Sequence, residues 1–201
     1  IRAETLEQFE RKFASCGFNY SAFYPCYGMA ETTLFTTGGD KHQQPVIQGV
    51  LAEELEQHSV VETEILSPSS RVFVGCGRPY LNTTVIIVNP ESLISCKKGQ
   101  VGEIWVSGES IAAGYWHRPE TTKETFQAYL KDTGAGPFLR TGDLGFLQEG
   151  ELFVTGRIKD VMIVRGQNYY PQDIEMTVQN SHIALRPNSG AAFTLEVKGE
   201  E

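Results

Sequence analysis

The chain has 201 residues, which is enough to bury a hydrophobic core and to form one or two domains. Its net charge of −8, from 17 basic and 25 acidic side chains, argues against nonspecific nucleic-acid binding, because such binding needs a basic surface. No apolar run approaches the roughly 20 residues of a membrane-spanning helix, so the composition favours a soluble globular protein.

Four cysteines and four histidines are spread along the chain without the spacing of a metal site. Cys16, Cys26, Cys76 and Cys96 form no C-x-x-C pair, so a zinc site is not indicated. We expect reduced, structural thiols in a cytoplasmic protein. The histidines are expected to be surface or packing residues.

The first element is expected to be an amphipathic helix over residues 3–15. Leu6, Phe9 and Phe13 recur at the spacing of one helical face, and charged residues occupy the opposite face. Cys16-Gly17 follows, and glycine favours helix ends because it adopts a left-handed conformation without strain. We therefore expect the helix to end there.

The next segment surrounds one carboxylate with apolar side chains. Phe23-Tyr24 is expected to be a short strand, and Pro25 to Gly28 a turn. Glu31 lies in the apolar run from Met29 to Phe35, where a carboxylate must be paired, bound to a metal or solvated at the end of an element. From this segment alone, an exposed or capping glutamate is the simpler interpretation.

Residues 40–70 are more polar and carry an acidic run over residues 53–56, which is typical of a solvated face. The pattern predicts a short strand at 46–47 and a short helix over 52–57. Beyond this stretch, apolar periodicity predicts strands at 83–88 and 102–107, helices at 121–130 and 171–180, and a strand at 191–197.

The span from Arg140 to Glu175 has the sequence RTGDLGFLQEGELFVTGRIKDVMIVRGQNYYPQDIE. It is expected to contain two buried strands, at residues 152–154 and 161–164. Asp143, Arg157 and Lys159 lie on turns beside these strands, and charged residues on such turns indicate a site instead of a simple connection. The alternatives are a plain Asp143–Arg157 salt bridge and an ordinary exposed lysine at position 159.

These motifs resemble the adenylate-forming superfamily of acyl and aryl ligases. More narrowly, YPCYGMAETTLF, RTGDLGF and GRIKDVMIVRGQNYYPQDIE, which occur in this order, resemble a fatty acyl-AMP ligase. The resemblance covers essentially the whole chain and implies that it is an internal fragment. The phosphate loop of the family would precede the fragment, and the lysine that completes adenylation would follow it.

The resemblance implies a mixed α/β (α+β) fold. Residues 1–158 would be the C-terminal part of the large adenylation domain, ending in a β-barrel-like subdomain. Residues 159–201 would be the hinge and the start of the small mobile domain. In the block GEIWVSGESIAAGYWHRPETTKETF, Tyr115-Trp116 is expected to fill the barrel. Residues 40–70 match in position the insertion that separates acyl-AMP ligases from acyl-CoA ligases, although a variable surface excursion explains them equally well.

The same resemblance assigns roles to the upstream motif. Tyr27, followed by Gly28, would stack on adenine, and Glu31 would hold a magnesium ion; an aromatic ring and a hard oxygen ligand suit these tasks. Ala30 stands where many members of the superfamily have a threonine that contacts phosphate, and acyl-AMP ligases usually have alanine here. Thr32 or the backbone is then the expected phosphate contact.

The downstream motifs would complete the site. Asp143 would accept hydrogen bonds from the ribose hydroxyls, and Arg157 would reach the ribose or a phosphate with its planar group of donors. Lys159 would be the hinge about which the small domain rotates.

The implied activity is ATP-dependent conversion of a fatty acid to acyl-AMP, with Mg²⁺ as cofactor and pyrophosphate released. The acyl group would pass to the phosphopantetheine thiol of an acyl carrier protein, for lipid, lipopeptide or polyketide biosynthesis. The fragment alone is expected to be inactive. The alternatives are an acyl-CoA ligase and a non-catalytic module that binds an acyl-adenylate.

Overall fold

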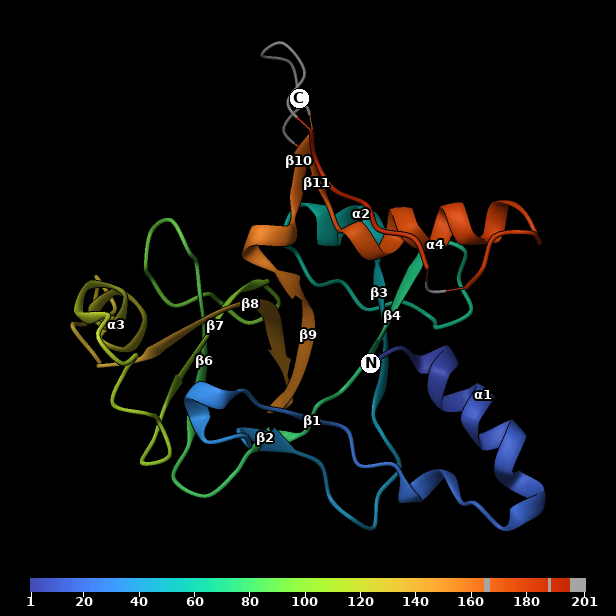
Figure 1. The fold of residues 1–201 in the computed structure, drawn as a ribbon, viewed down its shortest axis with the longest axis horizontal. Helices are drawn as coiled ribbons and strands as arrows, with labels where there is room; N and C mark the ends of the chain where they lie inside the picture. Colours follow the sequence, from blue (N-terminus) through green and yellow to red (C-terminus); the bar gives the residue numbers. More distant parts are fainter. Residues whose placement is uncertain (165–166, 188, 196–201) are drawn as a thin grey trace. The chain divides into compact units, whose positions relative to one another are not determined.

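The computed structural model describes residues 1–164, 167–187 and 189–195. The chain divides into two compact units, Ile1–Thr155 and Gly156–Glu201, and the division falls inside strand β9. Both units contain helices and antiparallel strands, so the fold class is mixed α/β, as expected. Figure 1 shows the course of the chain.

Short elements dominate both units. In chain order, the first contains α1 (Ala3–Phe13), η1 (Ala14–Cys16), η2 (Tyr20–Ala22), β1 (Cys26–Tyr27), η3 (Ala30–Thr32), β2 (Thr37–Gly38), β3 (Ile47–Leu51), α2 (Ala52–Glu56), β4 (Ser70–Val74), β5 (Arg78–Pro79), β6 (Thr84–Val88), β7 (Gly102–Ser107), α3 (Pro119–Phe126), β8 (Leu139–Gln148) and most of β9 (Glu151–Arg157). The second contains the end of β9, η4 (Ile158–Asp160), β10 (Met162–Val164), β11 (Gln167–Tyr169) and α4 (Pro171–Ser181). The elements labelled η are single turns of 3-10 helix.

Helix α1 contacts strand β4, and Figure 1 shows the helix at the edge of the first unit. Leu6 is 2% exposed and shares a small core with Val74, so the predicted amphipathic helix is confirmed. Phe9 and Phe13 are partly exposed, and their ring centroids lie 4.5 Å apart. Gly17 ends the helical run with a φ of 81°, in the left-handed region expected for this glycine.

Two small antiparallel sheets follow α1. Strands β1, β2 and β5 form one sheet, and β3 and β4 form the other, with Ile47 opposite Val74. The strand expected at Phe23-Tyr24 is wrong in position, because the ladder begins at Cys26. Phe23 instead packs its ring against α1, in contact with the ring of Phe9.

The largest sheet has the strand order β6-β7-β8-β9 and follows the β-rich pattern predicted from the sequence. Strands β6, β7 and β8 are antiparallel neighbours, and a β-bulge lies between Glu103 and Trp105. One face of the sheet buries the main hydrophobic core, formed by Val85, Ile87, Ile104, Val106, Phe126, Leu139 and Leu152. Branched apolar side chains suit this position because they pack well on a pleated surface.

The expectation that Tyr115-Trp116 fills this subdomain is wrong. Trp116 is 87% exposed and Tyr115 is 39% exposed, because both lie in the loop that leaves β7 before α3. The buried tryptophan is Trp105, which packs with Phe138 and is fully covered.

Helix α3 begins and ends earlier than predicted. It spans Pro119–Phe126, with proline in its first turn, where the missing N–H has no intrahelical partner to lose. After the helix, Ala128 pairs with Phe138 in an isolated bridge, so Leu130 is buried from a loop.

The second unit contains the antiparallel pair β10–β11, in which Met162 lies opposite Tyr169. Helix α4 begins at Pro171 and confirms the predicted final helix. The strand expected at 191–197 is wrong for residues 191–195, which adopt no strand; residues 196 and 197 lie outside the described residues. Across the described parts of the chain, no helix has both the length and the apolar content to cross a membrane.

Candidate functional site

Two of the predicted site residues meet in the first unit. The hydroxyl of Tyr27, at the end of β1, donates a hydrogen bond to Oδ2 of Asp143 in β8, at 2.7 Å. The two residues are 116 positions apart in the sequence. Asp143 is only 6% exposed, and Tyr27 packs against the main core. The fold therefore brings an aromatic ring and a carboxylate together from separate motifs.

Asp143 was expected on a turn but lies inside strand β8, where hydrogen bonds within β8 and to strand β7 hold its segment in place. The Asp143 N–H donates to Oγ1 of Thr141, which in turn donates to the carbonyl oxygen of Ile104. The Gly142 N–H donates to Oε1 of Glu103 at 3.2 Å. This bonding ties the Thr-Gly-Asp segment of β8 to strand β7, so the Asp143 carboxylate is held on a fixed part of the sheet.

Glu103 is a structural residue of the site that the sequence patterns did not identify. It is 2% exposed, and its Oε2 accepts hydrogen bonds from Trp105 at 2.9 Å and from Arg140, whose Nη2 lies 2.8 Å away. A buried carboxylate needs this full set of donors. The one available signal was a glutamate inside the apolar run at residues 102–107.

The upstream motif forms a tight turn that requires glycine at position 28. A Cβ atom on Gly28 would lie 1.6 Å from the carbonyl oxygen of Leu34, so no other residue fits without moving the backbone. The Leu34 N–H donates to the carbonyl oxygen of Met29 at 2.9 Å, which closes the turn. Gly28 thus allows the backbone next to Tyr27 to fold into this tight turn.

Glu31 lies on this turn, in η3, and its side chain is bound by a residue that was expected to be buried. The Tyr115 hydroxyl donates a hydrogen bond to Oε1 of Glu31 at 2.6 Å. This hydrogen bond, followed by partial burial and the charge of Glu31, raises the pKa of Tyr115 to about 12. The hydroxyl therefore stays protonated and acts as a donor at neutral pH.

Thr32 has a buried hydroxyl that is bonded within the protein. The residue is 1% exposed; its Oγ1 donates to the carbonyl oxygen of Met29 and accepts from the Thr36 hydroxyl. These hydrogen bonds stabilise the 3-10 turn η3. A phosphate contact from this side chain would have to break them, so the geometry favours the other expectation, the backbone of this turn.

The remaining predicted residues belong to the second unit. Arg157 is the last residue of β9, and Lys159 lies in η4; both side chains are exposed. The carbonyl oxygen of Arg157 accepts a hydrogen bond from the Val161 N–H at 3.2 Å, which closes this turn before β10. The segment expected to be a charged turn is therefore the end of strand β9 followed by a 3-10 turn.

The described residues include no cluster of three or more His, Cys, Asp or Glu side chains that could hold a metal ion by themselves. A single half-buried carboxylate such as Glu31 fits a different type of site. Magnesium keeps most of its water and is commonly held by one or two carboxylates together with substrate phosphates. The donor set at Glu31 therefore fits a magnesium ion that arrives with a nucleotide.

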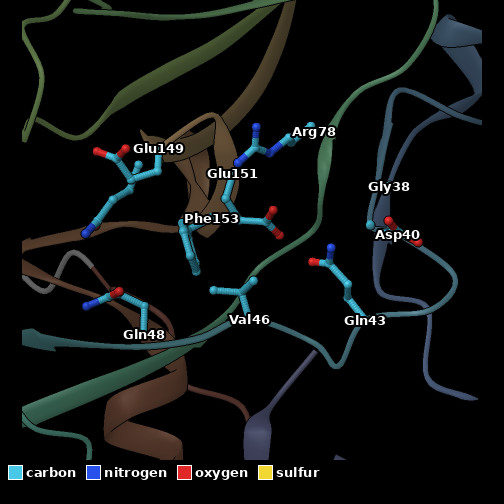
Figure 2. A pocket seen from close by; sticks show the side chains of 11 residues that line it. Gly38, Asp40, Gln43, Val46, Gln48, Arg78, Glu149, Glu151 and Phe153 are labelled. Carbon is cyan, nitrogen blue, oxygen red and sulfur yellow. The ribbon is translucent and has the colours of Figure 1, made fainter. Parts of the chain in front are cut away.

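A separate cavity of about 720 Å³ lies between β3, the β8–β9 turn and the segment after β2. Figure 2 shows its polar side chains around Val46 and Phe153. The charged lining residues are Asp40, Glu149 and Glu151 against the single base Arg78, so the lining is predominantly acidic. None of the predicted site residues lines this cavity.

All four cysteines are free thiols. Cys76 is buried, and this burial raises its pKa to about 11. A thiol with so high a pKa is a poor nucleophile at neutral pH, which agrees with a structural role.

Comparison with known proteins identifies the class. A family model described as AMP-binding enzyme matches residues 1–116, and the chain therefore belongs to the AMP-binding enzyme family. Within this family of adenylate-forming enzymes, the similarity over the whole chain is to ligases that act on fatty acids.

Two curated relatives and one solved structure illustrate this similarity. The chain is 50% identical to the medium-chain-fatty-acid–[acyl-carrier-protein] ligase JamA of Moorena producens, over 100% of this chain and 34% of that protein. It is 37% identical to the long-chain-fatty-acid–AMP ligase FadD32 of Mycolicibacterium smegmatis, over 97% and 32%. The fatty acyl-adenylate ligase of Legionella pneumophila, solved with acyl adenylate and pyrophosphate, is 47% identical over 90% of this chain and 31% of that chain, with a TM-score of 0.75. The chain thus spans about a third of the length of these relatives.

Proposed function

We propose that the whole protein activates a fatty acid with ATP and transfers the acyl group to an acyl carrier protein. The names of the relatives JamA and FadD32 support the substrate class, and the name of JamA supports the acceptor. One contact carries the proposal for this chain: the hydrogen bond between Tyr27 and Asp143, which pairs an aromatic ring with a carboxylate as recognition of an adenosine requires.

The first proposed step joins the fatty acid to the nucleotide. A carboxylate oxygen attacks the α-phosphorus of ATP, the bond to the bridging oxygen breaks, and pyrophosphate leaves with the electron pair. Negative charge accumulates around phosphorus, so the rate depends on positioning and on cationic stabilisation. Magnesium, when bound, would supply part of this positive charge.

In the second proposed step, the carrier-protein thiolate attacks the acyl carbon and AMP leaves, giving a thioester. In both steps the protein would bind the adenosine half of the nucleotide, which lies away from the reacting atoms. Remote binding of this kind lowers the barrier by holding the reacting atoms in place.

The residues of the first unit would hold the nucleotide. Tyr27 would stack on adenine, and Asp143 would accept hydrogen bonds from the ribose hydroxyls. Gly28 and Thr32 would keep the turn in shape, with its backbone facing phosphate. Glu31 would bind magnesium together with the phosphates.

The residues of the second unit would complete the reaction and switch between its steps. Arg157 would donate to the ribose or a phosphate, since its guanidinium keeps its charge and offers several donors in one plane. Lys159 lies in η4, between strands β9 and β10, and a change of its φ and ψ would rotate everything that follows.

We assign residues 1–158 to the end of the large adenylation domain and residues 159–201 to the hinge and the start of the small domain. The division into compact units after Thr155 supports a boundary in this region. Residues 40–70, which contain β3 and α2 and end where β4 begins, would be the insertion typical of acyl-AMP ligases. A cytoplasmic location would suit an enzyme that uses ATP and carries free thiols.

The activity is tested by ATP–pyrophosphate exchange with the whole protein. We expect exchange that depends on a fatty acid and is strongly reduced by Glu31→Ala and by Arg157→Ala. Glu91→Ala, which changes an exposed glutamate in the segment after β6, is the matched control. Normal exchange in both site variants would favour a non-catalytic module that binds an acyl-adenylate.

The acceptor is tested separately, by comparing thioester formation on a phosphopantetheinylated carrier protein with thioester formation on coenzyme A. We expect the carrier protein to be the better acceptor. A preference for coenzyme A would make the protein an acyl-CoA ligase and would leave the proposed adenylation step intact.

A further inference from the structure

Tyr115 extends the candidate site to a loop that the motifs did not assign to it. Its hydroxyl lies 2.6 Å from Oε1 of Glu31, which is 84 positions earlier in the sequence. The second carboxylate oxygen, Oε2, accepts no hydrogen bond from any of the described residues. One oxygen of Glu31 is thus held by the protein, and the other is available to a ligand.

The loop that carries Tyr115 is attached to the Glu31 turn by the backbone as well. The Ala112 N–H donates to the carbonyl oxygen of Glu31 at 2.8 Å. The Thr33 hydroxyl donates to the carbonyl oxygen of Ser110 at 2.7 Å. Three hydrogen bonds therefore join the loop after β7 to η3 and the residue behind it.

Tyr115 is also anchored to helix α3. The Tyr115 backbone N–H donates to Oγ1 of Thr122 at 2.9 Å, and the Tyr115 ring packs edge-on against the ring of Phe126, with centroids 5.1 Å apart. Phe126 belongs to the buried core of the large sheet. The hydroxyl is thus presented to Glu31 from a fixed ring and not from a mobile side chain.

We propose that Tyr115 is a positioning residue for Glu31, which orders the carboxylate for a divalent cation shared with nucleotide phosphates. This inference rests on the proposed function, in which Glu31 holds magnesium. A free glutamate side chain loses rotamer entropy when it binds a cation, and a hydrogen bond that orders it beforehand reduces this loss. Tyr115 would contribute through Glu31, without touching the substrate.

The test measures cation binding by the whole protein, with Mn²⁺ as the probe and a non-hydrolysable ATP analogue present. Electron paramagnetic resonance of free Mn²⁺ gives the dissociation constant. Tyr115→Phe keeps the ring on Phe126 and removes only the hydroxyl, and we expect it to weaken Mn²⁺ binding about five- to tenfold. Tyr129→Phe is the matched control, because the Tyr129 hydroxyl makes no hydrogen bond with the described residues.

A double-mutant cycle with Glu31→Gln separates positioning from general destabilisation. In the Glu31→Gln background, Tyr115→Phe is expected to have no further effect, because the group that it orders is gone. Thr122→Val, which removes the anchor of the Tyr115 backbone, is a second variant and should weaken binding in the same direction.

Two different failures can be told apart. If Glu31→Gln weakens Mn²⁺ binding but Tyr115→Phe does not, or if Tyr115→Phe acts equally in both backgrounds, the role of Tyr115 is refuted while the proposed function stands. If Glu31→Gln binds Mn²⁺ as tightly as the wild type, the metal assignment in the proposed function is itself wrong.

Discussion

Asp143 is the side chain on which nucleotide recognition would depend most directly. It is almost fully buried, lies in a segment of strand β8 that hydrogen bonds hold in place, and accepts a hydrogen bond from the Tyr27 hydroxyl. A carboxylate in this position suits the ribose hydroxyls because it can accept two donors at once. Its partner Tyr27 keeps the ring face for stacking while the hydroxyl at the ring edge is bonded.

We predict that Asp143→Asn weakens AMP binding by the whole protein about tenfold, since a hydrogen bond to a charged acceptor contributes about 1.5–3 kcal/mol. Isothermal titration calorimetry with AMP measures the effect. Asp132→Asn, in the exposed loop before β8, is the control and should bind AMP normally. Unchanged affinity in Asp143→Asn would remove this residue from the site.

Glu103 is a buried carboxylate, 2% exposed, that accepts hydrogen bonds from Trp105, Arg140 and Gly142. We predict that Glu103→Gln lowers the free energy of unfolding by about 2–3 kcal/mol, because the amide can no longer satisfy Arg140 and Trp105 as a charged acceptor. The estimate is below the full cost of breaking a buried ion pair because the Arg140 side chain is 34% exposed and partly screened by solvent.

The measurement for Glu103 is urea denaturation, and Glu109→Gln, an exposed glutamate, is the matched control that should leave the midpoint unchanged. An unaltered midpoint in Glu103→Gln would contradict a stabilising role for the buried carboxylate.

At the scale of elements, the β8–β9 connection shows how a two-residue turn sets the position of two strands. Glu149 and Gly150 have φ angles of 50° and 82°, the signs required at both central residues of a type I′ turn. Glycine adopts such angles without strain, whereas glutamate does so at a cost. The exposed Lys98–Glu149 ion pair accompanies the turn, with both side chains open to solvent.

We predict opposite effects at these two positions. Gly150→Ala should lower the stability by about 1 kcal/mol, because alanine is strained at this φ. Glu149→Asn should raise it by about 0.5 kcal/mol, because asparagine tolerates the left-handed region better. Thermal unfolding measures both; a stabilising Gly150→Ala would show that the turn differs from the one described.

The segment from Arg157 to Val161 is the second element with a consequence for function. It joins two strands through a single 3-10 turn, so little chain is available to absorb a rotation. If Lys159 is the hinge, fixing its φ near −65° with proline should slow thioester formation while adenylation continues.

We therefore predict that Lys159→Pro separates the two steps in the whole protein, and that Lys159→Gln, which removes only the charge, does not. Single-turnover measurements of acyl-AMP formation and of thioester formation check this. Equal rates of transfer in the proline variant and the wild type would show that residue 159 is not the pivot.

At the scale of the whole molecule, the 201 residues include both groups of motifs that would bind a nucleotide. They span about a third of the length of the related ligases. We predict that the isolated chain shows no ATP–pyrophosphate exchange with any fatty acid. The whole protein, assayed in parallel, is the positive control. Measurable exchange by the isolated chain would refute the prediction.

The local sequence pattern was sufficient to predict elements whose structure depends on residues nearby in the sequence. Residues 102–107 form strand β7 at the predicted bounds, and the predicted helix that starts at Pro171 forms α4. The end of α1 before Gly17 also follows from local chemistry, because the left-handed residue closes the helix wherever the chain goes next. The family, too, was evident from motifs in order along the chain.

Local pattern failed where burial depends on distant segments. The tryptophan in the core is Trp105 and not Trp116. Trp105 lies in a strand of the large sheet, whereas Trp116 lies in a loop and is exposed. Glu103 likewise looks out of place in an apolar strand until the fold brings it the hydrogen-bond donors of Arg140 and Gly142.

The sequence by itself determined the family, the main elements and the candidate site residues. Only the tertiary structure decided which of them meet: Tyr27 with Asp143, 116 positions apart, and Tyr115 with Glu31, 84 positions apart. The physical reason is that hydrogen bonds depend on positions in space to within a few tenths of an ångström. Periodicity and turn chemistry reach only a few residues along the chain, so they carry no information about such pairs.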